Sequence, residues 1–283
     1  MKKKWSERVG FFFLILSGML VIFMLGVILF DILSKGGASI SWDFLTRPPQ
    51  QGMTEGGIFP AILGTFLVSV ITVLFAVPFG MFAAIYLHEY AQPGKMTRLI
   101  RLAIRNLSGV PSIVYGLFGV VLFVQMMRFG TCVLSAGLTL GLLTLPWTIT
   151  ACEEALKTVP KSYREGAFAL GATKWYTIRT NVLPYAIPGM MTGMILGLAR
   201  AAGETAPILF TGAAFFLPHL PKSLFDQFMA LPYHLYIMAT QHHAIEKVRP
   251  LAYGTALVLL GLVLLLNISA IFIRYRFRKR MKR

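Results

Sequence analysis

Two long stretches without any charged side chain constrain this chain more than any other feature. Residues 11–30 and 251–273 consist of apolar residues and a few small or uncharged polar ones. A helix needs about 20 mostly apolar residues to cross the hydrocarbon core of a bilayer, so both stretches are predicted to span a membrane. Because residues 11–30 exceed the apolar core of a signal peptide and no small-residue cleavage site follows, we expect this span to be retained.

Four further apolar segments are long enough to span. Charged residues make up only 13% of the 283 residues, against about 25% in soluble domains, which excludes a soluble fold. Prolines inside several segments indicate kinks that neighbouring helices must accommodate. The sequence therefore predicts an all-α integral membrane protein with six transmembrane helices. The four additional spans are 61–87, 107–127, 133–152 and 187–217. Pro78, Pro111 and Pro146 lie in the first, second and third of these.

The positive charges are distributed unevenly around these spans. The chain has 27 Lys and Arg against 11 Asp and Glu, and 20 of the 27 lie in tail 1–10, the connection after the second span, segment 153–186 and tail 274–283. Basic residues concentrate on the cytoplasmic side of membrane proteins. We therefore expect both termini and 153–186 in the cytoplasm, and loops 31–60 and 218–250 outside. The basic excess is thus attributed to the membrane surface rather than to nucleic acid.

Several kinds of chemistry are not expected of this chain. Cys132 and Cys152 would lie about 30 Å apart on one helix, too far for a disulfide. His242 and His243 are adjacent and would point apart on a helix, which argues against a shared metal. The sequence contains no GxxxxGK[ST], GxSxG or HExxH pattern. No catalytic site, metal or cofactor is therefore predicted in this chain.

Segment 153–186 is the only long connection on the predicted inner side. It mixes aromatic and aliphatic residues with charges, and apolar residues recur at helical spacing before Gly171. Thr173 is suited to cap a second short helix, and Pro184 is expected to end it. The segment is predicted to form two short helices joined by a glycine elbow at the membrane face. An ordinary amphipathic interface helix is the alternative.

The same segment resembles the EAA motif of ABC importer permeases. That pattern has Glu-Ala-Ala, three residues, Gly, nine residues, Ile, one residue and Leu-Pro. Here Gly166 stands in place of an Ala and Asn181 in place of the Ile. The resemblance implies that 153–186 is the coupling loop, which docks on an ATPase subunit. The residues that it assigns to this loop are Glu165, Gly166, Ala167, Gly171, Leu183 and Pro184.

Two other stretches resemble signatures of phosphate permeases. Residues 106–119 are similar to their third-span signature and residues 200–207 to their fifth-span signature. Together with the EAA pattern, the order of these motifs and spans over residues 60–273 resembles the PstA type of phosphate ABC importer permease. The resemblance implies a type-I ABC importer permease fold in the bacterial inner membrane. It also implies a second permease (PstC-like), two ATPase subunits (PstB-like) that bind ATP and Mg, and an external phosphate-binding protein (PstS-like).

Arg200 is the only basic residue inside a predicted span. A charge at the bilayer centre costs about 2.5–3.5 kcal/mol on insertion scales, and Glu204 lies one helical turn away on the same face. We expect Arg200 to attract a passing anion while Glu204 partly neutralises the charge of Arg200. Thr205, the next residue of the signature, is also predicted to line the pathway. The alternative is a self-neutralising pair that only fixes helix packing.

Hydroxyl groups in the third span are further pathway candidates. Ser108, Ser112 and Tyr115 would lie on one face of a continuous helix and offer donors to phosphate oxygens. The alternative is that these hydroxyls bond to backbone carbonyls of their own helix.

Small residues repeat every four positions in the fifth span. Such a row lets another helix approach closely, either within the chain or at a subunit interface. Pro207 cannot donate to the carbonyl of Gly203, which predicts a bend beside Glu204. The row consists of Gly189, Gly193, Gly197 and Ala201.

These features predict the permease subunit of an ATP-driven importer of inorganic phosphate. Closure of the ATPase subunits would push on 153–186 and switch the spans between outward and inward access. Permeases for molybdate, tungstate or sulfate are the nearest alternative, since those anions are also tetrahedral. A passive anion channel or a membrane enzyme is a further alternative.

Overall fold

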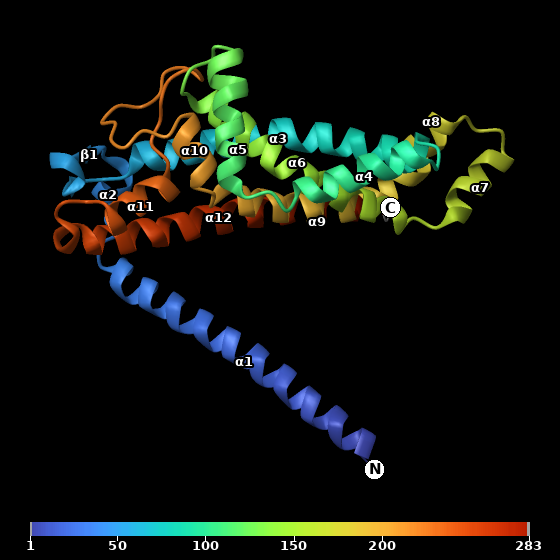
Figure 1. The fold of residues 1–283 in the computed structure, drawn as a ribbon, viewed down its shortest axis with the longest axis horizontal. Helices are drawn as coiled ribbons and strands as arrows, with labels where there is room; N and C mark the ends of the chain where they lie inside the picture. The colour runs from blue at the N-terminus through green and yellow to red at the C-terminus, as the bar shows by residue number, and fades with distance from the viewer. Residues whose placement is uncertain (1, 282–283) are drawn as a thin grey trace.

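The structure is a computed structural model that describes residues 2–281, and helices dominate it (Figure 1). Two very short strands pair as a hairpin, β1 (Pro49–Gln50) and β2 (Glu55–Gly56). The α-helices are α1 (Lys2–Gly37), α2 (Trp42–Thr46), α3 (Phe59–Ile85), α4 (Lys95–Leu107), α5 (Ser112–Gly119), α6 (Val133–Lys157), α7 (Lys161–Ala169), α8 (Lys174–Thr177), α9 (Leu183–Ala202), α10 (Ala206–Thr211), α11 (Leu231–Thr240) and α12 (Ile245–Met281).

Three π-helical segments extend these helices, and a 3-10 turn occupies the hairpin. The turn is η1 (Gln51–Met53), and the π-helical segments are η2 (Tyr86–Tyr90), η3 (Val120–Met126) and η4 (Ile178–Val182). Each π segment continues directly from an α-helix, so α3 with η2 and α8 with η4 and α9 form unbroken helical runs.

Five helical runs are long and apolar enough to cross a membrane. A sixth span exists if the bent pair Lys95–Leu107 and Ser112–Met126 is taken as one crossing. The prediction of an all-α membrane protein is thus confirmed, whereas the side on which the termini lie stays a prediction. The five runs are Gly10–Gly37, Phe59–Tyr90, Val133–Lys157, Lys174–Ala202 and Ile245–Arg276.

Two predicted spans are broken where the sequence suggested one helix. The third, expected over 107–127, turns by 102° between α4 and α5. Pro111 lies before the first residue of α5 with extended backbone (φ −56°, ψ 139°). A proline also disfavours helix in the residue ahead of it, here Val110, so α4 cannot continue into α5. The fifth, expected over 187–217, stops at Ala202 and resumes at Ala206. The predicted bend beside Glu204 is therefore a break in the α-helix at residues 203–205.

Pro184 does not end a helix as the sequence suggested. It lies in the first turn of α9, and the run from Lys174 continues through it. The π-helical segment η4 immediately before it shifts the hydrogen-bond register, which accommodates a residue that lacks an N–H. The second short helix of segment 153–186 is therefore continuous with the fifth span.

The centre of the bundle is formed by α3, α6 and α9. Gly137 and Gly141 of α6 lie against Ile71 and Phe75 of α3, so the two helices run in the same direction. The Thr72 hydroxyl donates to the carbonyl of Gly137 at 3.2 Å. A cluster of buried apolar residues from α3, α6 and α9 fills the bundle where α3 and α6 end.

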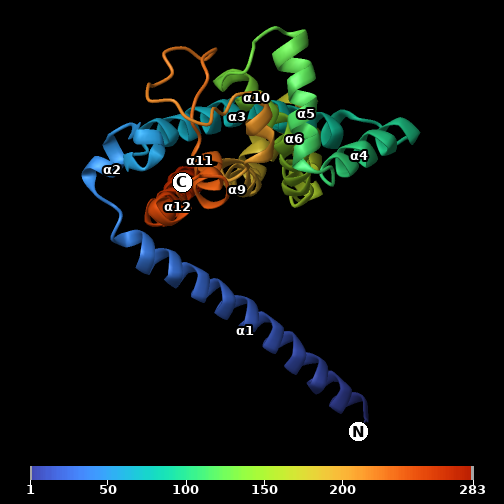
Figure 2. The same ribbon diagram turned by 60° about the vertical axis from the view of Figure 1, so that its left-hand side comes forward.

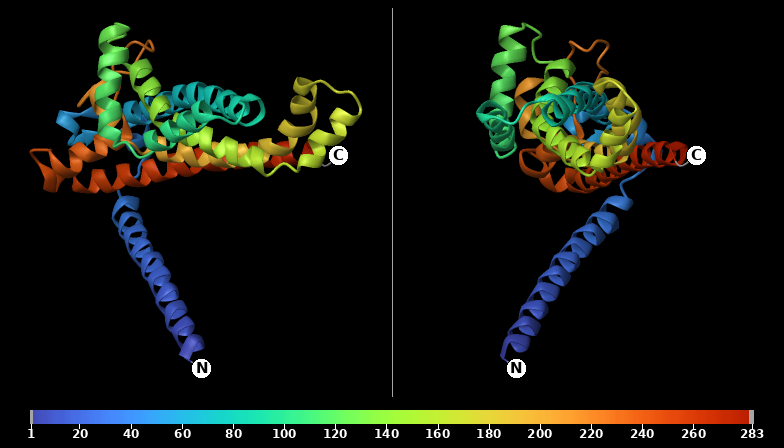
Figure 3. Two further views of the ribbon diagram at one scale, coloured as in Figure 1. Left: turned by 45° about the vertical axis from the view of Figure 1, so that its right-hand side comes forward. Right: turned by 90° about the vertical axis from the view of Figure 1, so that its right-hand side faces the viewer.

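Figure 1 shows α7 and α8 at one end of the bundle and α2 with the hairpin at the other. We call these the inner end and the outer end, following the predicted orientation. Helix α1 leaves the bundle near its outer end and diverges from it (Figure 2), with nearly all its described side chains exposed. Helix α5 stands steeply across the bundle in two further views (Figure 3).

Candidate translocation path and coupling surface

Arg200 and Glu204 form an ion pair at the interruption of the fifth span. Arg200 lies in the last turn of α9, and Glu204 lies in the break that follows. Arg200 Nε is 3.6 Å from Glu204 Oε1, a distance beyond a good hydrogen bond. The Arg200 side chain is 59% exposed and the Glu204 side chain 18% exposed. The pairing is loose, so most of the guanidinium fork is available to another anion.

The third-span and fifth-span signatures are in contact. A Cβ atom on Gly116 of α5 would lie 3.0 Å from Pro207 Cα and 3.2 Å from the Ala206 carbonyl oxygen of α10. The glycine permits this close approach, because a methyl group there would press on the backbone of α10. Ser112 lies one turn before Gly116 and shares its face, so it lies on the side of α5 that meets α10. Thr205 directly precedes α10.

The other two hydroxyl candidates bond to backbone. The buried Tyr115 donates to the carbonyl of Leu107 at 3.0 Å, and Ser108 donates to the carbonyl of Ile104 at 3.4 Å. Ser108 lies on the α4 side of the 102° bend. The prediction that Ser108, Ser112 and Tyr115 share one helix face was therefore wrong, because it assumed a continuous helix through Pro111.

The row of small residues in α9 packs inside the chain. A Cβ on Gly189 would lie 3.0 Å from Ala155 Cβ, and one on Gly197 would lie 3.3 Å from the Trp147 ring. Gly193 between them lies against Ala151. Each step of four residues along α9 matches a step of four back along α6, so the two helices are antiparallel. The buried Ala201 continues the row toward the break.

The glycine elbow lies between α7 and α8. Gly171 has φ +79°, a left-handed conformation that L side chains rarely adopt. Thr173 caps α8 as predicted, since its side chain accepts a hydrogen bond from the Tyr176 N–H at 3.4 Å. Of the EAA residues, Ala167 is buried, Glu165 and Gly166 are exposed, and Leu183 and Pro184 are half-buried.

Large apolar side chains are exposed around this elbow. Leu170 is 89% exposed, more than any other large hydrophobic residue described. Exposed large apolar side chains at the end of a bundle suit a surface that binds another protein. We call this surface the elbow patch; it consists of Tyr163, Phe168, Leu170, Trp175 and Tyr176.

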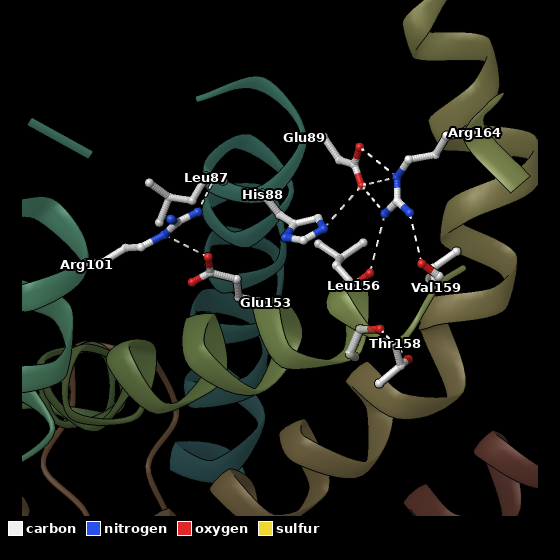
Figure 4. A network of polar contacts seen from close by, with 10 residues as sticks. Leu87, His88, Glu89, Arg101, Glu153, Leu156, Thr158, Val159 and Arg164 are labelled. Atoms are coloured by element: carbon white, nitrogen blue, oxygen red, sulfur yellow. Dashed lines mark hydrogen bonds and ion pairs between the residues drawn. The ribbon is translucent and has the colours of Figure 1, made fainter. Parts of the chain in front are cut away.

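A buried ion pair, not predicted from the sequence, fastens α7 to the bundle (Figure 4). Arg164 Nη2 donates to Glu89 Oε1 at 2.6 Å, and Arg164 Nε lies 3.2 and 3.3 Å from the two carboxylate oxygens. The same guanidinium donates to the carbonyls of Val159 at 3.0 Å and Leu156 at 3.4 Å. One signal was available in the sequence: Glu89 is the only acidic residue between Glu55 and Glu153.

A second ion pair at the inner end holds α4. Arg101 Nε lies 2.8 Å from Glu153 Oε1 of α6, and Arg101 Nη2 donates to the carbonyl of Leu87 at 2.8 Å. His88 lies between the two pairs in Figure 4, with Nε2 3.8 Å from Glu89 Oε1. The inner ends of α3, α4, α6 and α7 are thus connected by two ion pairs.

The two adjacent histidines do not point apart. His242 and His243 lie in the turn between α11 and α12 rather than on a helix, and their rings stack with centroids 4.5 Å apart. His242 Nε2 is 2.7 Å from the carbonyl oxygen of Gly52, and His242 Nδ1 accepts from the Ala244 N–H. Both ring nitrogens of His242 therefore have hydrogen-bond partners within the protein. Cys132 and Cys152 are buried free thiols.

Solved structures of ABC importers share this fold. A chain of a bacterial alginate ABC transporter, bound to its pentasaccharide-loaded periplasmic protein, superposes with TM-score 0.67 at 14% identity, covering 95% of this chain and 96% of the other. A chain of the inward-facing MetNI methionine ABC transporter gives TM-score 0.58 at 18% identity, covering 78% of this chain and 94% of the other. These likenesses define the class: a multi-pass membrane protein with the fold of type-I ABC importer permeases.

Sequence similarity identifies the family. Residues 76–283 match the binding-protein-dependent transport system inner membrane component family, and this chain belongs to it. The phosphate transport system permease protein PstA 1 of Mycobacterium tuberculosis (strain H37Rv) is 32% identical, covering 100% of this chain and 92% of the relative. A probable ABC transporter permease protein, YqgI of Bacillus subtilis (strain 168), is 33% identical over 84% of this chain and 85% of the relative.

Proposed function

We propose that this chain is the transmembrane permease subunit of an ATP-driven importer of inorganic phosphate. The observation that carries the proposal is the near full-length likeness to a phosphate transport permease, with the Arg200–Glu204 pair at the interruption of the fifth span. Phosphate is a small tetrahedral anion that must pass without being trapped. A partly exposed and partly neutralised arginine suits that requirement.

Phosphate passes beside Arg200 in this mechanism. The planar guanidinium offers paired N–H donors that match two oxygens of a tetrahedral anion. Glu204, 3.6 Å away, lowers the net positive charge and so favours release. Ser112 and Thr205 are suited to donate hydroxyl hydrogen bonds from the contact between α5 and α10, whereas Tyr115 and Ser108 would first have to leave their backbone partners.

Coupling to ATP acts through the elbow patch. Its exposed apolar side chains dock on an ATPase subunit, and Arg164 transmits the resulting displacement of α7 to Glu89 of η2. The bonds from Arg164 to the carbonyls of Leu156 and Val159 extend the connection to the inner end of α6. A push on the elbow therefore moves α3 and α6 together, and these helices form the centre of the bundle.

The proposed complex contains several further chains. A second permease (PstC-like) completes the pathway, two ATPase subunits (PstB-like) bind ATP and Mg, and an external phosphate-binding protein (PstS-like) delivers the anion. This chain then needs no cofactor of its own. The family description, a binding-protein-dependent inner membrane component, supports this composition and a location in a bacterial inner membrane.

Uptake of radiolabelled phosphate tests the proposal. Cells that lack this gene are complemented with the wild-type chain or with the Arg200→Ala variant, and uptake is followed with and without depletion of ATP. Restored, ATP-dependent uptake by the wild type alone is expected. Equal uptake without the chain rejects the phosphate function. Stronger competition by molybdate, tungstate or sulfate than by phosphate favours another oxyanion, and uptake that persists without ATP favours a passive channel.

A further inference from the structure

Helix α4 carries a row of arginines along one face. Arg98, Arg101 and Arg105 follow each other at spacings of three and four residues, which places them on the same side of the helix. They line an open cavity of about 390 Å³ together with Thr97 and Leu102. We call these three arginines the α4 basic row.

Only one arginine of this row is neutralised by a carboxylate in the part of the chain that the structure describes. Arg101 pairs with Glu153 at 2.8 Å. Among the side chains that the structure describes, those of residues 10–276 and 279, no ion pair with an acidic side chain is found for Arg98 or Arg105. The cavity is therefore bordered by two guanidinium groups with unused donors, one before and one after the anchored Arg101.

The anchoring of Arg101 fixes the level of the row relative to the spans. It bonds to the carbonyl of Leu87 near the end of the second span and to Glu153, one turn before the end of α6. The row therefore lies where the central helices reach the inner surface. Phospholipid headgroups occupy this level in a bilayer.

The rest of α4 is suited to acyl chains. None of its residues is buried, and Met96, Leu99 and Leu102 are 69%, 60% and 53% exposed. Apolar side chains beside a basic face let one helix contact acyl chains and a charged headgroup together. A free anion would account for the arginines alone, whereas a phospholipid accounts for both faces.

We propose that α4 binds an anionic phospholipid of the inner leaflet. Arg98 and Arg105 hold the headgroup phosphate, Arg101 keeps the helix at that level, and Leu99 and Leu102 contact the acyl chains. The ligand chemistry is a phosphodiester with apolar tails. This site is independent of the phosphate pathway at Arg200, and its occupancy does not require the proposed transport function.

Lipid binding to the purified full-length complex tests this site. The probes are dioleoyl phosphatidylglycerol and dioleoyl phosphatidylcholine, and binding is quantified by native mass spectrometry. We expect Arg98→Gln/Arg105→Gln to weaken phosphatidylglycerol binding about 10- to 30-fold, since each basic residue at an anionic surface contributes about 1 kcal/mol. Phosphatidylcholine binding should not change. The matched control Lys161→Gln/Arg179→Gln removes the same charge at the inner end and should retain the wild-type affinity.

Three results would overturn the proposal. One is an unchanged phosphatidylglycerol affinity in the Gln variant, and another is an equal loss in the control, which would indicate nonspecific surface charge. The third is displacement of the lipid by inorganic phosphate at equal concentration, which would assign the site to the free anion. If the Gln variant does not assemble, a photoactivatable phosphatidylglycerol on the wild-type complex decides: crosslinks must map to residues 95–107, and their absence rejects the site.

Discussion

Arg164 and Glu89 are 75 positions apart in the sequence, and their side chains meet at 2.6 Å at the inner end of the bundle. The side chain of Arg164 is 17% exposed and that of Glu89 is 7% exposed. Breaking a buried pair by removing one partner typically costs about 3–5 kcal/mol, because a charge is left without compensation. In the proposed coupling mechanism, this contact would carry a displacement of α7 to the end of the second span.

Glu89→Gln should therefore separate ATP hydrolysis from transport. The variant keeps the shape of the side chain but loses the charge, and we expect phosphate transported per ATP hydrolysed to fall at least several-fold. The measurement is uptake and hydrolysis by the same reconstituted complex. The charge exchange Glu89→Arg/Arg164→Glu should recover part of the ratio. Glu154→Gln breaks an exposed pair with Lys157 and serves as control; an equal effect there would refute the coupling role.

Arg200→Ala should lower phosphate uptake at least tenfold while the complex still assembles. The side chain is 59% exposed, so its loss leaves no cavity in the core. Glu204→Gln should instead tighten phosphate binding, because removing the carboxylate leaves the charge of Arg200 without its partner. We therefore expect a lower KM for phosphate and slower turnover. Both are measured by initial uptake rates over a range of phosphate concentrations. Loss of assembly in Arg200→Ala would instead support the purely structural alternative.

Two glycines of the coupling segment should respond in opposite ways to alanine. Gly171→Ala places a Cβ at φ +79°, which costs about 1–2 kcal/mol, and should loosen the elbow. Gly166→Ala lies inside α7 with open space around it, and alanine there stabilises a helix by about 1 kcal/mol. Hydrogen exchange of residues 161–177 in the complex distinguishes them. Faster exchange in both variants, or in neither, would contradict this account.

The contact between α6 and α9 should not tolerate a larger residue at Gly193. A methyl group there would collide with Ala151, so Gly193→Ala forces the helices apart and should cost about 1–3 kcal/mol. The measurement is the thermal stability and yield of the purified complex. Gly26→Ala in α1, where nothing lies within 4 Å, is the matched control. Unchanged stability in Gly193→Ala would show that the packing is softer than the geometry indicates.

Stability should fall on acidification because of His234 in α11. Burial lowers the pKa of His234 to about 4 from an ordinary value of 6.5, with a smaller contribution from His242. Below pH 6.5 the unfolded chain takes up a proton that the folded chain refuses. Stability is therefore lost as the pH falls from 6.5 to about 4, by about 3 kcal/mol in total.

Thermal unfolding of the complex between pH 7.5 and 4.5 measures this loss. His234→Gln should flatten the pH dependence, whereas His219→Gln, at an exposed position of the same outer segment, should leave it unchanged. A wild-type slope in the His234 variant would rule out this origin.

Local sequence was sufficient for the spans, but it indicated only one of their two interruptions. The apolar runs that form α3, α6 and α12 can be recognised from composition alone, because a helix needs little more than sufficient length and hydropathy to span a bilayer. Pro207 correctly marked the bend in the fifth span. Pro111 was ambiguous, since a proline is tolerated in the first turn of a helix but also favours an extended residue ahead of it.

The site was predictable only where its parts are close in sequence. Arg200 and Glu204 are one turn apart, so their pairing follows from helix geometry. The contacts of Arg164 with Glu89 and of Arg101 with Glu153 join segments far apart in the chain, and no local pattern specifies them. The sequence also left open which helix packs against the small-residue row of α9. Trp147, Ala151 and Ala155 of α6 meet that row only because the two helices are antiparallel in the fold.

The glycine contacts between α6 and α9 extend from Ala155 to Trp147. In the break that follows α9, at residues 203–205, the N–H groups of Gly203 and Glu204 donate to the carbonyls of Arg200 and Ala201, three residues back, in place of the regular four-residue pattern. The interlocked portion has no freedom to slide, since each step along one helix is occupied by the other. Any change of angle between α9 and the pair formed by α5 and α10 is therefore concentrated at these three residues. Such a change would fall where Arg200 meets Glu204, so it would also alter how strongly the arginine is neutralised.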